Sequence, residues 1–245
     1  MLKSLQESLR MIKCYHSANE LEMLLQRAKD NDSSYVDFLD ELLGVEVSGR
    51  EKTRLKRYLK QAHFPTIKTI DDFDFKFQTS ITKKEVNNWL SGNWIEQRHN
   101  IILMGPPGVG KTHLAISCGH AAIFKHYKVI FYTMQKLLEE MILAEDEQRF
   151  QKYLKTLLRY DLIIIDELGY LPLKPLYANL FFQLINCCYE YRSLIITSNK
   201  LFDEWGNYFG NQTIATAILD RLLHHAEAVI LNGDSFRLKN TVNKG

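Results

Sequence analysis

A strand, a glycine-rich turn and a helix follow one another over residues 100–117, and this order limits the fold more than any other feature. Residues 101–104 are apolar, the octapeptide GPPGVGKT occupies positions 105–112, and a helical pattern begins directly after it. The octapeptide fits G-x-x-x-x-G-K-[ST], a loop whose consecutive backbone N–H groups surround anionic phosphate oxygens. The sequence therefore predicts a P-loop that binds the phosphates of a nucleotide.

The residues of this loop have separate predicted roles. Lys111 is expected to reach the β- and γ-phosphates, and the Thr112 hydroxyl is expected to bind Mg²⁺. The helix that opens at Gly110 directs its unpaired N–H groups and its positive dipole end toward the same phosphates. The residues predicted to bind the nucleotide are Gly105, Pro106, Pro107, Gly108, Val109, Gly110, Lys111, Thr112 and His113.

Strands and helices alternate around the P-loop, which predicts an α/β fold of the P-loop NTPase type. The predicted strands after the loop cover residues 128–132, 161–166, 193–198 and 228–231. The predicted helices cover residues 82–91, 134–144, 175–191 and 213–225. A βαβ alternation of this kind produces a parallel sheet with helices on both faces.

The N-terminal part of the chain has a different pattern. Apolar residues recur at helical spacing over residues 2–44, which predicts a small all-helical domain, and Ser33 or Ser34 is expected to cap one of its helices. Residues 64–80 contain a proline and several aromatic residues and read as an extended linker that docks those aromatics. We therefore predict a helical domain at residues 1–63, a linker at 64–80 and an ATPase domain at 81–245.

Residues 50–60 form the strongest basic patch of the chain. This predicted helix has six basic residues and one acidic residue, Glu51. Two interpretations stay open, since the patch could contact DNA phosphates or could be an ordinary solvated helix face. The formal net charge of the whole chain is only +2 and does not by itself indicate a nucleic-acid partner.

Composition limits where the protein works. With 46% hydrophobic and 24% charged residues the chain is typical of a globular protein. We find neither a run of about 18 uncharged apolar residues nor a signal peptide, so we expect no membrane association and no secretion. The four cysteines lack C-x-x-C spacing, which suggests no zinc site and is compatible with a reduced cytoplasm.

Two acidic residues follow a second apolar strand. Residues 162–165 are LIII, and Asp166 and Glu167 come directly after them, which is the form of a Walker B element. Asp166 is expected to bind Mg²⁺, largely through water. Glu167 is expected to act as the general base that polarises the attacking water, a role that separates a hydrolase from a protein that only holds nucleotide. A solvated carboxylate at a strand end is the alternative.

Two further residues are candidates for catalysis. Asn199 follows a third apolar strand and could orient water at the γ-phosphate, although an asparagine is also common where a strand turns into a loop. Arg221 lies on an otherwise apolar helix, where it could pair with Asp220 or another acid. The more specific interpretation is an arginine finger, which stabilises charge in the transition state.

Several segments are more specific than any single motif. They are AHFPTIKTIDDFDF, GPPGVGKTHLA, DLIIIDELGYLPL, ITSNKLFDEW, AILDRLLHHAE and GDSFRLK. Together they resemble the IstB-like ATP-binding proteins, helper ATPases of insertion-sequence transposition that are related to bacterial helicase loaders. The match covers nearly the whole chain. It implies an AAA+ fold, ATP and Mg²⁺ as ligands, a homo-oligomer that assembles on duplex DNA with weak sequence specificity, and a transposase of the same element as partner.

The resemblance also implies roles for individual residues. Lys111 and Thr112 would belong to Walker A, Asp166 and Glu167 to Walker B, and Asn199 would be sensor 1. Arg221 would be the finger that acts on a neighbouring subunit, and Arg237 would be sensor 2. The chain departs from the family pattern at Cys188, where an arginine is more common, and at Phe236, which replaces a tyrosine.

Three other functions share parts of this pattern. A helicase loader in DNA replication has the same ATPase motifs and differs mainly in its N-terminal domain and partner. A small-molecule kinase also uses a P-loop, but the Asp166–Glu167 pair together with Asn199 argues against it, because a kinase must exclude the water that they would position. A nucleotide-dependent scaffold without turnover is the third alternative.

Overall fold

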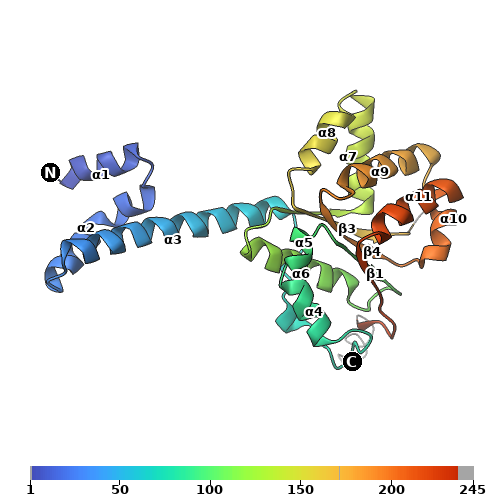
Figure 1. Ribbon diagram of the computed structural model, residues 1–245, viewed down its shortest axis with the longest axis horizontal. Helices are drawn as coiled ribbons and strands as arrows, with labels where there is room; N and C mark the ends of the chain where they lie inside the picture. The colour runs from blue at the N-terminus through green and yellow to red at the C-terminus, as the bar shows by residue number, and fades with distance from the viewer. Residues whose placement is uncertain (1, 171, 237–245) are drawn as a thin grey trace, which may run out of the picture. The chain divides into compact units, whose positions relative to one another are not determined.

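In the computed structural model, residues 2–170 and 172–236 are described, and the chain forms two compact units, residues 1–57 and 58–245. The first unit contains α1 (Leu2–Met11), α2 (Tyr15–Asp30) and most of α3 (Tyr35–Ala62). The end of α3, from Tyr58 onward, belongs to the second unit (Figure 1).

The helices of the first unit follow from local signals. The Ser34 hydroxyl accepts a hydrogen bond from the Asp37 N–H at 3.2 Å, and the Asp37 carboxylate accepts one from the Ser34 N–H, so the predicted serine cap is present. Beyond this cap α3 continues without a break through Gly44 and Gly49. The basic patch at residues 50–60 therefore belongs to a long helix that begins at Tyr35.

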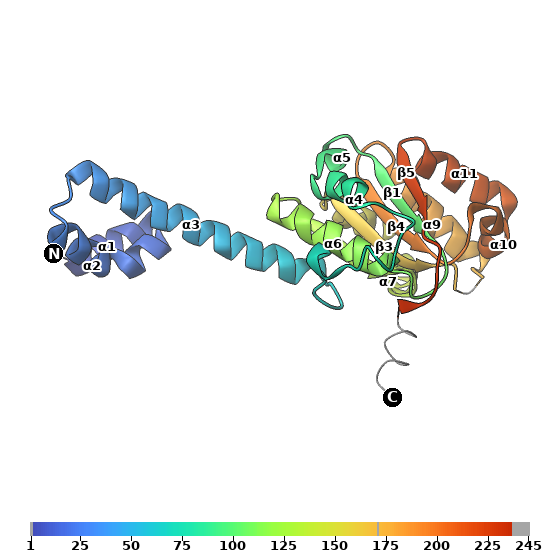
Figure 2. The same ribbon diagram turned by 90° about the horizontal axis from the view of Figure 1, so that it is seen from below.

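The second unit is built on a five-stranded parallel sheet, as predicted (Figure 2). Its spatial order is β2-β3-β4-β1-β5, so β4 lies between the P-loop strand and the Walker B strand. In parallel sheets, ligands bind beyond the carboxyl ends of the strands, and this order brings three such ends together. The strands are β1 (Asn100–Met104), β2 (Val129–Thr133), β3 (Leu162–Leu168), β4 (Ser193–Ser198) and β5 (Ala226–Ile230).

Helices cover both faces of the sheet. On one face lies α6 (Lys111–Phe124), with α4 (Lys83–Leu90) packed on it. On the other face lie α7 (Met134–Asp146), α9 (Pro175–Cys188) and α11 (Gln212–Leu223), with α8 (Phe150–Leu157) beside α7. The remaining short helices are α5 (Asn93–Glu96), α10 (Trp205–Phe209), η1 (Ile70–Asp72) and η2 (Phe202–Glu204).

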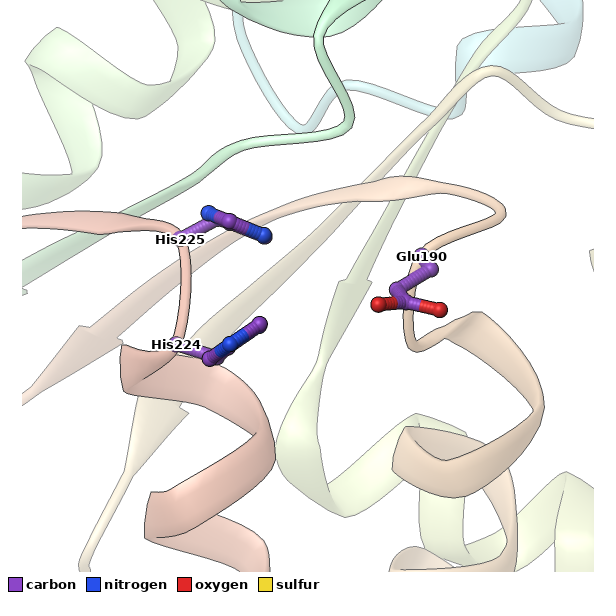
Figure 3. A group of neighbouring side chains, drawn as sticks. All are labelled: Glu190, His224 and His225. Carbon is purple, nitrogen blue, oxygen red and sulfur yellow. The ribbon is translucent and has the colours of Figure 1, made fainter.

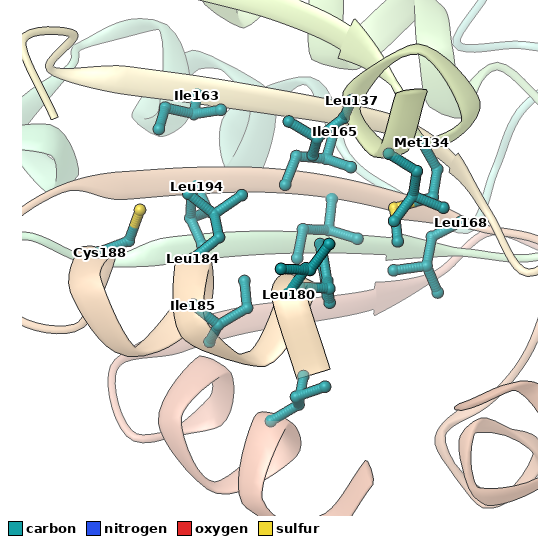
Figure 4. Close-up of a cluster of buried hydrophobic side chains, with 14 of the residues drawn as sticks. Met134, Leu137, Ile163, Ile165, Leu168, Leu180, Leu184, Ile185, Cys188 and Leu194 are labelled. Carbon is teal, nitrogen blue, oxygen red and sulfur yellow. The ribbon is translucent and has the colours of Figure 1, made fainter. Parts of the chain in front are cut away.

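Alternate residues of each strand supply the two layers of core. Ile163 and Ile165 of β3 belong to the cluster under α7 and α9 (Figure 4). Ile164 points the other way, and its Cδ1 would lie only 2.6 Å from a Cβ placed on Gly119 of α6. All three isoleucines are fully buried, and burying each such side chain contributes about 1.5–3 kcal/mol. Burial on both faces explains why the strand reads as a continuous apolar run.

The structure corrects several predicted boundaries. The helix predicted at residues 175–191 ends at Cys188, because Glu190 has φ +61° and the chain turns there. The helix predicted at 213–225 ends at Leu223, and β5 starts at Ala226 instead of residue 228. The sequence interpretation missed α5, α8 and α10. Within the described residues, no helix has the length and apolar character needed to cross a membrane.

Candidate active site

The P-loop connects β1 to α6, and its backbone has a positive φ at all three of its glycines, including Gly105 at +138°. Gly108 has φ +85° and Gly110 has φ +101°. A Cβ on Gly108 would lie 2.1 Å from Ser235 Oγ, and one on Gly110 would lie 2.7 Å from the Phe73 ring. The glycines thus let neighbouring segments approach the loop closely at the start of α6, and backbone N–H groups at the start of a helix are the form of a phosphate site.

Lys111 lies on the first turn of α6 and folds over this loop. Its ammonium donates hydrogen bonds to the carbonyl oxygens of Gly105, at 2.6 Å, and Pro106, at 2.7 Å. The positive charge is therefore held at the mouth of the cradle, beside the N-terminal dipole of α6. This position fits its predicted role of binding β- and γ-phosphate oxygens.

Asp166, at the end of β3, meets two threonine hydroxyls. The Thr112 hydroxyl donates to its carboxylate at 2.9 Å, and the Thr197 hydroxyl of β4 donates to the same carboxylate. Burial raises the pKa of Asp166, while the two hydroxyls and the charge of Lys111 act in the opposite direction. The Thr112 and Asp166 oxygens form a hard oxygen donor pair that suits Mg²⁺.

Glu167 sits in an irregular part of β3. The register of β3 against β4 shifts between Ile165 and Leu168, and Glu167 has φ +66°. Its N–H donates to Thr197 Oγ1 at 3.0 Å, and its side chain is exposed. A bulge re-aims the side chain that it carries. Here it separates the exposed Glu167 carboxylate from the buried Asp166 carboxylate, so the two acids meet different environments.

Asn199 follows β4 and so lies between the P-loop and the two acids. Its backbone N–H donates to the Leu168 carbonyl at 3.3 Å. Its Oδ1 is buried and has no hydrogen-bond partner among the described residues. A buried acceptor of this kind needs a donor, and the residue lines the cavity described next. Asn199 therefore carries a buried acceptor without a donor among the described residues, beside the cavity.

A cavity of about 570 Å³ joins these groups. This volume is within the ordinary range for sites of small ligands and cofactors, about 300–1,000 Å³. One side is formed by residues 107–113 together with Asp166, Glu167, Thr197 and Asn199. The other side is formed by the linker and the C-terminal segment, namely Pro65, Thr66, Lys68, Asp72, Phe73, Asp74, Phe77, Gln78 and Phe236.

The linker contacts Val109 of the P-loop and His113, the residue that follows the loop. The His113 ring packs edge-on against Phe73, and its Nε2 lies 2.7 Å from the Thr69 carbonyl oxygen. Gln78 donates to the Val109 carbonyl at 3.1 Å. Sequence reasoning did not assign the linker to the site, nor Thr197. Thr197 could have been found as a polar residue within an apolar strand. The linker could have been found from its aromatic residues at positions 73 and 77.

Arg221 packs against other residues and does not contact the described groups that line the cavity. On α11, its guanidinium stacks over the Phe182 ring at 4.9 Å and donates to the Asn186 side chain at 2.9 Å. It lines a second, small pocket and is not among the described residues that line the 570 Å³ cavity. Arg237, predicted as sensor 2, lies outside the described residues.

Comparison with known proteins identifies the family of this chain. The family model described as IstB-like ATP binding protein matches residues 7–244. This chain belongs to that family. An IstB-like relative from Pseudomonas aeruginosa, named for insertion sequence IS21 and for ATP binding, is 41% identical over 97% of this chain and 90% of its own length.

Solved structures show the same fold for this IstB-like protein. The DnaC helicase loader has a TM-score of 0.57 and 22% identity, over 72% of this chain and 99% of that chain. AMPPCP-bound DnaA from Aquifex aeolicus has a TM-score of 0.58 and 20% identity, over 74% of this chain and 55% of that chain. The predicted AAA+ fold is confirmed, and the IstB-like chain is an ATP-binding ATPase.

Proposed function

We propose that this IstB-like ATPase assembles with ATP as a homo-oligomer on duplex DNA and assists the transposase of its own insertion sequence. The observation that carries the proposal is the 41% identity, over almost the whole chain, to a protein named for insertion sequence IS21. A second relative, 40% identical over 99% of this chain, is named for insertion sequence IS232 of Bacillus thuringiensis. An ATPase retained in such elements is expected to serve their movement.

Within the cavity, each residue has a proposed step. The P-loop N–H groups and Lys111 hold the triphosphate. Glu167, exposed on its bulge, accepts a proton as water attacks the γ-phosphorus. The Asn199 Oδ1, which has no partner among the described residues, accepts a hydrogen bond from that water and fixes its direction. The bond to the leaving ADP then breaks, and inorganic phosphate carries the new oxygen.

Thr112 and Asp166 are the proposed Mg²⁺ site. When bound, Mg²⁺ would neutralise charge on the β- and γ-phosphates. The chain contributes a hydroxyl and a carboxylate that already touch, at 2.9 Å. The Thr197 hydroxyl donates to the same Asp166 oxygen as Thr112 and accepts a hydrogen bond from the Glu167 N–H, so this threonine couples the two acids.

The linker is the proposed site for the adenosine part of ATP. The phosphates are fixed at the start of α6, and the rest of the cavity is bounded by Phe73, Phe77 and Phe236. Phe77 and Phe236 pack edge-on, with ring centroids 5.2 Å apart. Such rings offer apolar surface and stacking for a purine. ATP binding at this place would join the linker and the C-terminal segment to the P-loop.

Arg221 is proposed to act on the ATP of an adjacent subunit. Its guanidinium is held by Phe182 and Asn186, away from the cavity of its own chain. An arginine in this position can complete a site only across an interface. This requirement makes turnover depend on assembly, which is how DNA would stimulate the enzyme.

The basic half of α3 is the proposed DNA contact. Lys52, Lys56, Arg57 and Lys60 are exposed. Contacts to phosphates hold DNA without reading base edges, so binding is expected to depend weakly on sequence. Arg50 has a different role, because it donates to Glu46 at 2.7 Å and to the Lys13 carbonyl within the first unit.

A helicase loader is the second candidate, because the DnaC loader shares the fold over 99% of its own chain. One pair of measurements separates the two. Phosphate release should rise with duplex DNA, and strand transfer by the transposase of the same element should require the ATPase. Stimulation by single-stranded DNA alone, with no effect on the transposase, would contradict the proposal and favour the loader.

A further inference from the structure

Glu190, His224 and His225 form a cluster of metal-ligating side chains outside the ATP cavity (Figure 3). Glu190 lies in the turn between α9 and β4, and the histidines lie where α11 ends and β5 begins. One ligand atom from each residue lies within 4.8 Å of the others. We propose that these three residues bind a divalent transition-metal ion of the Zn²⁺ class.

The donor set decides which ion fits. Two imidazoles and one carboxylate with open positions are typical of Zn²⁺ and of Co²⁺, Ni²⁺ or Cu²⁺, whereas Mg²⁺ and Ca²⁺ prefer oxygen ligands. The small pocket that includes Glu190 and His225 is also lined by three arginines, and their charge opposes a cation; they are Arg98, Arg192 and Arg221. Mg²⁺ or Ca²⁺, held weakly by imidazole, would not overcome this repulsion. The strong bonds between imidazole and an ion of the Zn²⁺ class can overcome it.

The geometry requires only side-chain rotation. Ligand atoms about 2.0–2.1 Å from a tetrahedral ion are about 3.4 Å apart, so atoms that now lie within 4.8 Å of one another would need to approach by up to about 1.4 Å. All three residues are exposed and have room to move. The rings are already arranged side by side, since the His224 and His225 centroids are 4.1 Å apart and His99 stacks on His225 at 5.2 Å.

Tyr189 supplies an outer partner of the kind that metal-binding histidines use. Its hydroxyl lies 3.1 Å from Nδ1 of His224. When this nitrogen carries the proton and donates to the tyrosine oxygen, Nε2 keeps its lone pair for the ion. The cysteine spacing of the sequence could not indicate such a site, because its ligands come from two segments that meet only in the fold.

Cobalt binding to the full chain tests the site, because Co²⁺ reports its ligands in its absorption spectrum. The wild-type protein, freed of metal with EDTA, should bind one Co²⁺ and show d–d bands without the charge-transfer band of a thiolate. His224→Gln and His225→Gln should each weaken binding strongly. Tyr189→Phe should weaken it about tenfold, the lower end of the 10–100-fold effect expected for an outer partner.

Two matched controls keep the result specific. His63→Gln removes an exposed histidine elsewhere, and Asp166→Asn removes a carboxylate of the proposed Mg²⁺ site; both should bind Co²⁺ as the wild type does. Equal binding by the wild type and His225→Gln, a thiolate band, or no binding at micromolar Co²⁺ would overturn the proposal. Circular dichroism of each variant verifies that it is folded.

A bound ion would also have a consequence for catalysis, which rests on the proposed function of Arg221. His224 and His225 follow this residue by three and four positions, directly after α11 ends at Leu223, so an ion that ties them to Glu190 would restrain the end of α11. We expect Zn²⁺ to lower ATP turnover in the wild type and not in His225→Gln. If turnover does not change while Co²⁺ binds as expected, the role of Arg221 is wrong and the metal site stands.

Discussion

The two units of this chain differ in how much of their apolar surface they bury. In the 58–245 unit, both faces of the sheet are covered and the central strands are fully buried. In the 1–57 unit, the buried hydrophobic cluster consists of Leu21, Leu24 and Leu42 among the described residues. Met11 and Val36 are 79% and 74% exposed. Small units bury a smaller fraction of their surface, so the first is expected to be the less stable.

The units also hold their charged groups differently. In the ATPase unit, the buried Asp166 carboxylate has an elevated pKa because burial disfavours its charge. In the first unit, burial also raises the pKa of Glu46, but hydrogen bonds from the Ser17 and His16 N–H groups and from Arg50 outweigh it and lower the pKa. The ionised Asp166 carboxylate therefore destabilises the folded state, whereas the ionised Glu46 carboxylate stabilises it.

The largest effect is expected at Arg221. If chemistry needs two subunits, Arg221→Ala should lower turnover by about 10³–10⁵-fold, as expected for loss of an arginine finger, with ATP binding retained. Mixing it with Lys111→Ala should restore some activity, because one type of interface keeps both groups. Phosphate release measures this, with Arg159→Ala as the surface control. An inert mixture of subunits shown to co-assemble would rule out action across an interface.

Glu167→Gln should lower turnover by about 10²–10⁴-fold, the usual contribution of a general base. Binding of ATP and DNA should remain, because the amide has the shape of the carboxylate and the Glu167 N–H still bonds to Thr197. Lys111→Ala should instead weaken ATP binding itself. Fluorescent-nucleotide binding and phosphate release distinguish the two. Turnover at the parental rate in the glutamine variant would show that the base is another group.

Reversal of Arg54, Arg57 and Lys60 to glutamate tests whether DNA binding belongs to α3. We expect weaker binding for all DNA sequences and a flatter slope of log K against log salt, by about 0.9 per lost phosphate contact. ATP binding should not change. Reversal of Lys152, Lys155 and Arg159, which are exposed on or just after α8, makes the same charge change away from α3. Equal losses in both triple variants would indicate net charge instead of a site.

Glu46→Gln should destabilise the first unit by about 1–3 kcal/mol, because hydrogen bonds to a charged acceptor become bonds to a neutral one. The direction in which stability changes with pH follows from the lowered pKa of Glu46. This stabilisation is present above the ordinary glutamate pKa and is lost as pH falls through the folded value. Hydrogen exchange of α2 measures it. Glu41→Gln, which removes a surface pair with Arg27, should have little effect.

The smallest effect is a gain in stability. Since burial raises the pKa of Asp166, its stabilising contribution is present at low pH and is lost as pH rises through the folded value. Asp166→Asn keeps an acceptor for Thr112 and Thr197 without the charge. The melting temperature at neutral pH should rise, by about 2–4 °C for each kcal/mol gained, while hydrolysis is lost. A lower melting temperature would mean that the ionised carboxylate stabilises the fold.

Periodicity and local motifs were sufficient for much of this molecule. The apolar run at residues 162–165 required a strand buried on both faces, and GPPGVGKT required a loop between a strand and a helix. The β4 strand has the predicted ends, Ser193 and Ser198. Boundaries were less certain where the chain turns through an unusual conformation. The end of α9 is an example, since no local sequence pattern predicted the positive φ of Glu190.

The sequence by itself determined the five strands, most of the helices that flank them, and the chemical character of the phosphate loop and the strand-end acids, because glycine content, apolar period and strand-end acids are local properties. Only the tertiary structure decided which distant groups meet. The order β2-β3-β4-β1-β5 places Thr197 against Asp166 and Asn199 beside the P-loop, and the linker folds back so that Phe73 contacts His113. The turn after α9 likewise brings Glu190 to the end of α11. Such meetings depend on crossovers and packing between segments far apart in the chain, for which no single stretch of sequence carries the information.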